Sequence, residues 1–190
     1  MQPLPLTKRP LDLLYVVFFV VHIPASILID LQTLYPPSLV PGWMSPIMPW
    51  YLNMSGDPVT AGGMGLYGQP LHTLWLRSFF WIEALFQFPC FFIGIWAITK
   101  GKHAWYPLLI AYSASTLTTM VPVLAYLLSY PSSQHKAKNY ETITEGQRWQ
   151  VFGSMVPWVL IPAALCIDLS IRIARVLGSM DRMALAKKST

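Results

Sequence analysis

The amino-acid sequence predicts an all-α membrane protein, a four-transmembrane-helix bundle with a lumenal loop cap. Three observations lead to this fold class. The 190-residue chain is 54% hydrophobic and only 11% charged, with a mean hydropathy of +0.47, whereas soluble domains carry about 25% charged residues. Four apolar runs each exceed the ~20 residues that cross ~30 Å of hydrocarbon as a helix. These runs are continuous rather than alternating, which excludes a transmembrane β-barrel.

The predicted spans cover residues 11–31, 75–99, 105–129 and 151–173. Aromatic residues border several of them, as expected for the interfacial belt of a membrane protein. Every span contains proline, which removes one helical hydrogen bond, and four kinked helices together favour a bundle that opens around a cavity. We expect one transmembrane domain over residues 8–175 and a cytosolic tail over residues 176–190.

The distribution of basic residues predicts that both termini are cytosolic. Nine of the 13 lysines and arginines lie in the two tails and the second loop, against four in the other two loops, and positive charge accumulates on the cytosolic side. The chain ends in Lys187-Lys188-Ser189-Thr190. This ending resembles the dilysine retrieval signal, which is read in the cytosol. We therefore expect the protein in the endoplasmic reticulum membrane and the contiguous nuclear membrane.

The loop over residues 32–74 is rich in proline, tryptophan and methionine. It is too apolar for a solvated linker, so we expect it to fold as a cap over the lumenal end of the bundle. Asn53-Met54-Ser55 fits a glycosylation sequon, and packing of the cap is expected to hide this asparagine.

Two acids, Asp30 and Glu83, lie inside the apolar spans. An ionised side chain at that depth costs about 2.5–3.5 kcal/mol by insertion scales, which makes each acid a candidate functional residue. The structural alternative is a neutral acid that only joins two helices. Because two nearby carboxyls cannot both ionise in low dielectric, we expect the deeper Glu83 to keep its proton and Asp30 to carry the charge. Such a site would bind a lipophilic cation or the polar end of a sterol.

Other polar residues fall at helical spacing in the same half of the membrane. His22 and Ser26 share a face with Asp30, although a lone helical histidine is more often a core residue. The remaining members of these faces are Gln87, Tyr112, Thr116, Thr119, Met155 and Trp158. Asp168 lies four residues before Arg172, which predicts a structural ion pair.

The histidines have no zinc-site spacing, and no phosphate loop, nucleophile elbow or redox motif occurs. We therefore expect no metal, no cofactor and, with basic residues that only flank apolar runs, no nucleic-acid partner.

Several motifs occur in an order that resembles the sigma-2 receptor family, a branch of the EXPERA family, which also includes the emopamil-binding sterol isomerase. They are Arg9-Pro10-Leu11-Asp12, His22-Ile23-Pro24, Ile29-Asp30-Leu31-Gln32, Gly56-Asp57-Pro58, Glu83-Ala84-Leu85-Phe86-Gln87-Phe88-Pro89, Tyr112-Ser113-Ala114-Ser115-Thr116-Leu117-Thr118-Thr119 and Leu160-Ile161-Pro162. The resemblance runs from about residue 8 to residue 175. The sequence departs from the family in a longer cap, around residues 61–67, and in Trp158, where tyrosine is usual.

The resemblance implies an occluded pocket that opens to the bilayer and binds cholesterol-like sterols and amphiphilic amines. Asp30 would pair with the ligand amine with support from Glu83, while Asp57 would hold the cap together. The pocket would further be lined by His22, Gln87, Tyr112, Thr119 and Trp158. A homodimer and membrane proteins of sterol transport are the partners that the resemblance suggests.

Three functions compete at this point. The favoured one is a receptor-like protein of sterol and cholesterol handling without chemistry of its own. The second is a Δ8–Δ7 sterol isomerase, because that reaction needs an acid and a base across the ring, and Asp30 and Glu83 could serve. The third is a structural or chaperone-like membrane partner whose cavity is incidental.

Overall fold

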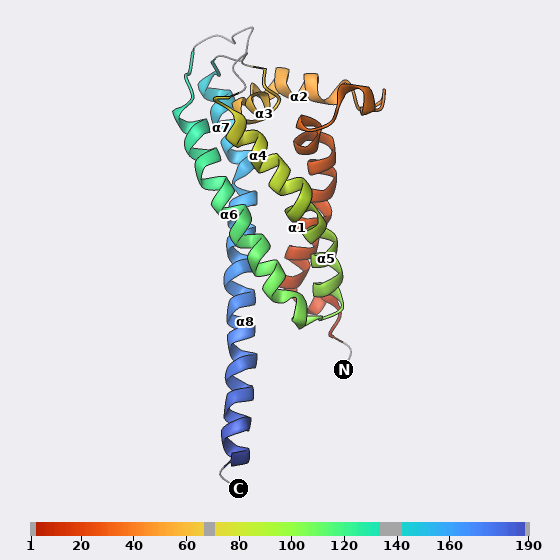
Figure 1. Ribbon diagram of the computed structural model, residues 1–190, viewed down its shortest axis with the longest axis vertical. Helices are drawn as coiled ribbons and strands as arrows, with labels where there is room; N and C mark the ends of the chain where they lie inside the picture. Colours follow the sequence, from red (N-terminus) through yellow and green to blue (C-terminus); the bar gives the residue numbers. More distant parts are fainter. Residues whose placement is uncertain (1–2, 67–70, 134–141, 189–190) are drawn as a thin grey trace.

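The computed structural model describes residues 3–66, 71–133 and 142–188, and this part of the chain contains helices and no named β-strand. Four helical runs are long and apolar enough to cross a membrane: Pro10–Thr33, Leu74–Thr99, His103–Ser129 and Glu145–Leu185. The predicted all-α membrane fold with four spans is confirmed. Both ends of the chain lie at the same end of the bundle (Figure 1).

The first two spans are each interrupted by a π-helical turn. After the short 3-10 turn η1 (Leu6–Lys8), the first span comprises α1 (Pro10–Ala25), the π-turn η2 (Ser26–Asp30) and the 3-10 turn η3 (Leu31–Thr33). The second comprises α4 (Leu74–Ile82), the π-turn η5 (Glu83–Gln87) and α5 (Phe88–Thr99). Each π-turn contains one of the two intramembrane acids, and π-turns within α-helices are frequent at functional sites.

Proline explains where the second π-turn can form. Pro89 has no N–H to donate to the carbonyl four residues earlier, so an α-helical bond is missing there in any case. The N–H of Phe88 instead reaches the carbonyl of Glu83, five residues back. In the first span the N–H of Leu31 likewise bonds the carbonyl of Ser26.

The third span is one long helix, whereas the fourth consists of two. The turn η6 (His103–Trp105) leads into α6 (Tyr106–Ser129), and the fourth span comprises α7 (Glu145–Met155) and α8 (Pro157–Lys188). Thr144 and Gln147 form a capping box that starts α7. The predicted fourth span thus contains the junction of two helices. Residues 176–188 of the predicted tail continue α8, which leaves the bundle (Figure 1).

The cap lies over the end of the bundle opposite the termini (Figure 1). It contains the 3-10 turn η4 (Pro37–Leu39), α2 (Ile47–Ser55) and α3 (Pro58–Gly63). Trp43 and Trp50 remain 67% and 62% exposed, as expected of aromatic anchors at the membrane surface. Asn53 is also exposed, so the expectation that the cap hides it is wrong. The reason is that α2 buries Met48 and Leu52 and turns its opposite face outward.

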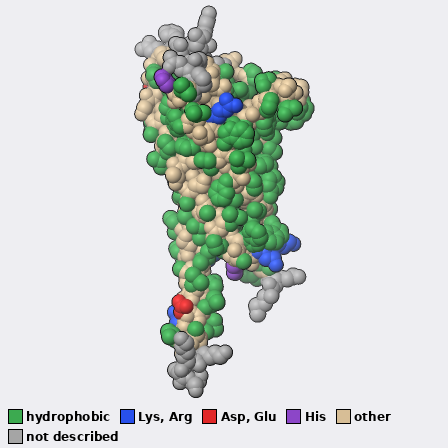
Figure 2. Space-filling model, in the orientation of Figure 1, with side chains coloured by type: hydrophobic (Ala, Val, Ile, Leu, Met, Phe, Trp, Pro, Cys, Tyr) green, Lys and Arg blue, Asp and Glu red, His purple; other side chains and the backbone are tan. Residues whose placement is uncertain are grey.

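Apolar side chains cover much of the visible flank of the bundle, and basic side chains lie near its ends (Figure 2). Inside, α1 packs along α5 and α6 packs along α8. The core between them is aromatic and aliphatic; its fully buried large side chains include Tyr15, Phe19, Phe91, Tyr106, Tyr112, Leu109, Leu165 and Leu169. This arrangement is typical of a bundle whose outer surface faces lipid.

Near the termini, an ion-pair network joins α1 to α8, and hydrogen bonds from one of its arginines add α5. Asp12 is 2% exposed and pairs with Arg9 at 2.6 Å and with Arg172 at 2.7 Å. Arg172 also pairs with Asp168 at 2.7 Å, which confirms that predicted pair; the part played by Asp12 was not predicted. Arg9 further donates to the carbonyls of Ile98 and Thr99, which end α5. Every buried charge here therefore has an opposite partner.

Gly94 allows α5 to approach α1 closely. A Cβ at this position would lie 2.5 Å from Cε2 of Phe19, which is fully buried. We expect Gly94→Ala to lower stability by about 1–3 kcal/mol through overpacking, although alanine favours a helix intrinsically. Thermal unfolding in detergent measures the effect. Gly153→Ala is the matched control, because nothing lies within 4 Å of its Cβ, and a loss as large in the control would contradict the packing argument.

Asp12→Asn should destabilise the bundle strongly. Removal of one partner from a buried ion pair costs about 3–5 kcal/mol because the other charge stays buried. The control is Glu145→Gln, since Glu145 is 58% exposed in its pair with Arg148 and such pairs contribute about 0–1 kcal/mol. Thermal unfolding of both variants checks this difference, and equal melting temperatures would contradict it.

Candidate functional site

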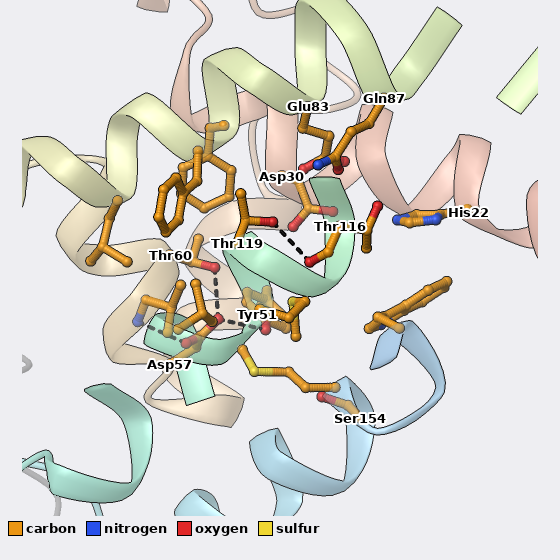
Figure 3. A pocket seen from close by; sticks show the side chains of 18 residues that line it. His22, Asp30, Tyr51, Asp57, Thr60, Glu83, Gln87, Thr116, Thr119 and Ser154 are labelled. Atoms are coloured by element: carbon orange, nitrogen blue, oxygen red, sulfur yellow. Dashed lines mark hydrogen bonds between the residues drawn. The ribbon is translucent and has the colours of Figure 1, made fainter. Parts of the chain in front are cut away.

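A cavity of about 150 Å³ lies between the cap and the bundle. All four spans and both cap helices contribute to its wall, so that its composition is set by residues far apart in the sequence. The lining residues are His22, Asp30, Tyr51, Asp57, Val59, Thr60, Leu76, Phe79, Phe80, Glu83, Gln87, Thr116, Thr119, Met120, Val123, Ser154, Met155 and Trp158. The wall is thus largely apolar and aromatic, with Asp30 and Glu83 together in one part of it and Asp57 beside the hydroxyls of Tyr51 and Thr60 in another (Figure 3).

The two intramembrane acids face each other across the two π-turns. One potential ligand atom from each of Asp30, Glu83 and His22 lies within 4.8 Å of the other two. The hydroxyl of Ser26 in η2 donates a hydrogen bond to Oε1 of Glu83 in η5, which joins the two turns directly. Two carboxyls this close in an apolar wall cannot both ionise, because a second charge would be neither solvated nor paired.

His22 is held by aromatic rings rather than by hydrogen bonds. Its ring stacks on Phe91 at 4.3 Å between centroids and lies 4.2 Å from the ring of Trp158. The residue is 7% exposed, and its Nδ1 has no hydrogen-bond partner among the described residues. Stacking therefore sets the ring orientation, and one of the two ring nitrogens lies within 4.8 Å of a carboxylate oxygen of each acid.

The third acid of the cavity, Asp57, is fully engaged by the cap. Its carboxylate accepts hydrogen bonds from the N–H of Val59, the hydroxyl of Thr60 and the hydroxyl of Tyr51 (Figure 3). It is thereby the N-cap of α3. Burial raises the pKa of Asp57, while the hydrogen bonds from Thr60 and Val59 oppose that shift. Burial, with Asp57 nearby, likewise raises the pKa of Tyr51.

The remaining polar side chains of the wall have local partners. Thr116 donates to the carbonyl of Tyr112 at 3.1 Å, and Thr119 donates to the carbonyl of Thr116 at 3.0 Å. Nε2 of Gln87 donates to Oγ of Ser115 at 3.1 Å. Because these donors are already engaged, Asp30, Glu83 and His22 are the groups best placed to bind something that enters the cavity.

The structure places six of the seven predicted pocket residues in the wall: His22, Asp30, Glu83, Gln87, Thr119 and Trp158. Tyr112 is not among the lining residues. Its ring lies 5.5 Å from Phe19 and 5.7 Å from Phe91, in the core below the cavity. It is fully buried there, and Thr116, one turn further along α6, takes the wall position instead.

Several wall residues were not predicted as pocket residues, namely Tyr51, Thr60, Thr116 and Ser154. The sequence placed Thr116 on the same helical face as Thr119, although it was not included among the predicted pocket residues. Tyr51 and Thr60 belong to the cap, whose folding brings them over the cavity; no periodicity in the loop signals this. Asp57 was expected only in the cap, but it also contributes to the wall. The side chains of Lys187 and Lys188 lie outside the described residues.

Known proteins are similar in sequence to this chain over most of its length. Residues 43–169, more than half of the chain, match the EXPERA (EXPanded EBP superfamily) family. Sigma intracellular receptor 2 of Macaca fascicularis and that of Homo sapiens are each 33% identical over 168 residues, which cover 86% of this chain and 89% of the relative. The Xenopus tropicalis protein of the same name is 29% identical over 164 residues, covering 85% and 88%. The chain therefore belongs to the EXPERA family.

Proposed function

We propose that this protein binds sterols and cationic amphiphilic ligands in its intramembrane acidic pocket and acts in sterol handling in the endoplasmic reticulum. The observation that carries the proposal is the placement of Asp30 and Glu83 together in a largely apolar cavity. The similarity to proteins named sigma intracellular receptor 2 supports a receptor-like function.

The chemistry of the wall favours an amphiphile with one basic or polar end. An ionised Asp30 beside a protonated Glu83 offers a single negative charge in low dielectric, where its attraction for an amine far exceeds the value in water. The aromatic rings of Phe79, Phe80 and Trp158 would contact the apolar body of the ligand. A sterol hydroxyl could take the place of the amine by donating to the same carboxylate.

The other wall residues divide between the ligand and the cap in this proposal. His22, Gln87, Thr119 and Trp158 line the ligand site, whereas Asp57 holds α3 and α2 together. The homodimer and the membrane partners of sterol transport that the family resemblance suggests stay predictions.

The proposal also includes the location of the protein in the endoplasmic reticulum and the orientation of its termini toward the cytosol. Basic residues predominate in the tails and the second loop, which supports cytosolic termini. Helix α8 carries the chain away from the bundle as far as Lys188 (Figure 1). That geometry would hold the terminal lysines clear of the membrane, where a cytosolic retrieval machinery could bind them.

A sterol isomerase is the second candidate, favoured by the closeness of His22 to both acids. Double-bond migration requires one group to protonate a carbon and another to remove a proton elsewhere. Purified protein should be incubated with a Δ8-sterol, and the products should be separated by chromatography and identified by mass spectrometry. Conversion to the Δ7-sterol would establish the enzyme, whereas binding without conversion would support the receptor.

Asp30→Asn should weaken binding of a lipophilic amine much more than Glu83→Gln. Loss of the buried counter-ion costs roughly 2–5 kcal/mol, so we expect a decrease of about thirty-fold or more in affinity. Glutamine at position 83 can still accept from Ser26 and donate to Asp30, so the second variant should lose less than about tenfold. Radioligand binding to purified protein measures both.

Thermal unfolding should accompany these measurements, so that a folding defect is separated from loss of the charge. Thr118→Val is a control, because Thr118 is exposed on α6 and is absent from the cavity wall. Equal damage by Asp30→Asn and Glu83→Gln would contradict the proposed division between a charged and a neutral acid.

Replacement of both terminal lysines, Lys187→Ser with Lys188→Ser, should move the protein forward from the endoplasmic reticulum along the secretory route. Microscopy of the tagged chain, with the tag at the N-terminus, measures the change. The matched control is Arg182→Ser, which removes a tail charge outside the dilysine pattern. An unaltered distribution of the double variant would mean that another signal retains the protein.

A further inference from the structure

The spacing of the histidines along the chain predicted no metal. We propose instead that His22, Asp30 and Glu83, brought together by the fold, form a binding site for a divalent transition-metal ion, with Zn²⁺ as the best match. The three side chains come from two different spans, and their potential ligand atoms all lie within 4.8 Å of one another. The site shares the cavity with the proposed amine ligand but does not depend on the binding of an amine.

The buried His22 beside the two acids is the observation that points to a ligand. A buried polar atom without a partner is costly, yet Nδ1 of this 7% exposed residue has none among the described residues. The ring itself is oriented, since it is stacked on Phe91 and packed against Trp158. One of its ring nitrogens lies within 4.8 Å of a carboxylate oxygen of each acid, where it could bind a metal ion, and metal sites require ligands whose orientation is already set.

Charge balance favours a divalent cation at this position. Two carboxyls in an apolar wall either share a proton or need two positive charges nearby. A divalent ion would neutralise both of them at once, which neither a monovalent ion nor a single amine can do. The resulting site would carry no net charge, as low-dielectric surroundings favour.

The ligand atoms available, imidazole nitrogen and carboxylate oxygen, indicate which divalent ion the site would bind. One imidazole and two carboxylates suit Zn²⁺, which takes histidine nitrogen and carboxylate oxygen at ~2.0–2.2 Å. Tetrahedral ligands at that distance lie roughly 3.3–3.6 Å apart. Since the potential ligand atoms lie within 4.8 Å of one another, small rotamer changes that bring them at most about 1.5 Å closer would suffice. Mg²⁺ and Ca²⁺ prefer oxygen ligands alone and fit less well.

Three protein ligands leave one zinc coordination position free. That position would be taken by water or by an oxygen of a ligand within the cavity. Ser26 would act as a supporting residue, because its hydroxyl already donates to Glu83 and such hydrogen bonds orient carboxylate ligands.

The test uses the purified full chain in detergent micelles, without a polyhistidine tag, titrated with ZnCl₂ alone by calorimetry. We expect one saturable Zn²⁺ per chain. His22→Gln, Asp30→Asn and Glu83→Gln should each weaken binding by about tenfold or more, as loss of even a supporting residue commonly does. His103→Gln is the matched control, since His103 lies in η6 at the opposite end of the bundle, and its affinity should be unchanged.

A spectroscopic measurement covers the case in which a variant fails to fold. Co²⁺ bound to the unaltered chain should give the intense visible absorption of a tetrahedral nitrogen–oxygen site, and Zn²⁺ should displace it. Absence of saturable Zn²⁺ binding, an octahedral Co²⁺ spectrum or equal weakening by His103→Gln would overturn the metal site. Amine binding measured separately with a chelator present tests the proposed function, so the two proposals can fail independently.

Discussion

The hydrogen bond from Ser26 to Glu83 is the interaction on which the cavity depends. It links the two π-turns, η2 and η5, at the depth where the spans would otherwise present acids to lipid. A carboxyl directed into lipid would have no partner, and unsatisfied polar groups cost several kcal/mol there. With the bond in place, Glu83 faces Asp30 and His22, and the lipid-facing side of this span keeps exposed apolar residues such as Leu85. The hydrogen bond between Ser26 and Glu83 thus accounts both for the polar interior of the bundle at this depth and for its apolar outer surface.

The two ends of the bundle differ in whether their buried acids have partners of opposite charge. Near the termini, Asp12 has two arginine partners and Arg172 has two carboxylate partners, so charge is balanced and the helices are held together. Beneath the cap, Asp30 and Glu83 lie close to each other and to His22, whose Nδ1 has no hydrogen-bond partner in the described part of the chain. Balanced networks stabilise a single arrangement, whereas an unbalanced pair of acids favours binding of a cation. From this difference we infer that the charged residues near the termini stabilise the fold, whereas the acids beneath the cap form the proposed ligand site.

The cap completes the cavity wall. Contacts between cap residues that are close together in the sequence orient its two helices over the spans. Asp57 starts α3 and accepts the hydroxyl of Tyr51 from α2, so one carboxylate orients both cap helices. Those helices then add Tyr51, Val59 and Thr60 to the wall. Close packing of Phe80 against Gly63 connects α3 with α4, the helix that leads into η5. The cap is therefore coupled by contacts to the element that holds Glu83.

The sequence by itself determined the four spans, because continuous apolar runs of membrane length have no other stable form in lipid. It also singled out Asp30 and Glu83, since acids in such runs are costly, and the Asp168–Arg172 pair, since four residues make one helical turn. Only the tertiary structure decided that Tyr112 belongs to the core while Thr116 lines the cavity, that Asp12 completes the ion network and that α8 extends past the bundle. It also brought His22 and Asp30 of the first span to Glu83 of the second, which no spacing within one segment could reveal. Periodicity assigns a residue to a face of its own helix, but the π-turns change that register, and the neighbour opposite each face depends on how the helices pack.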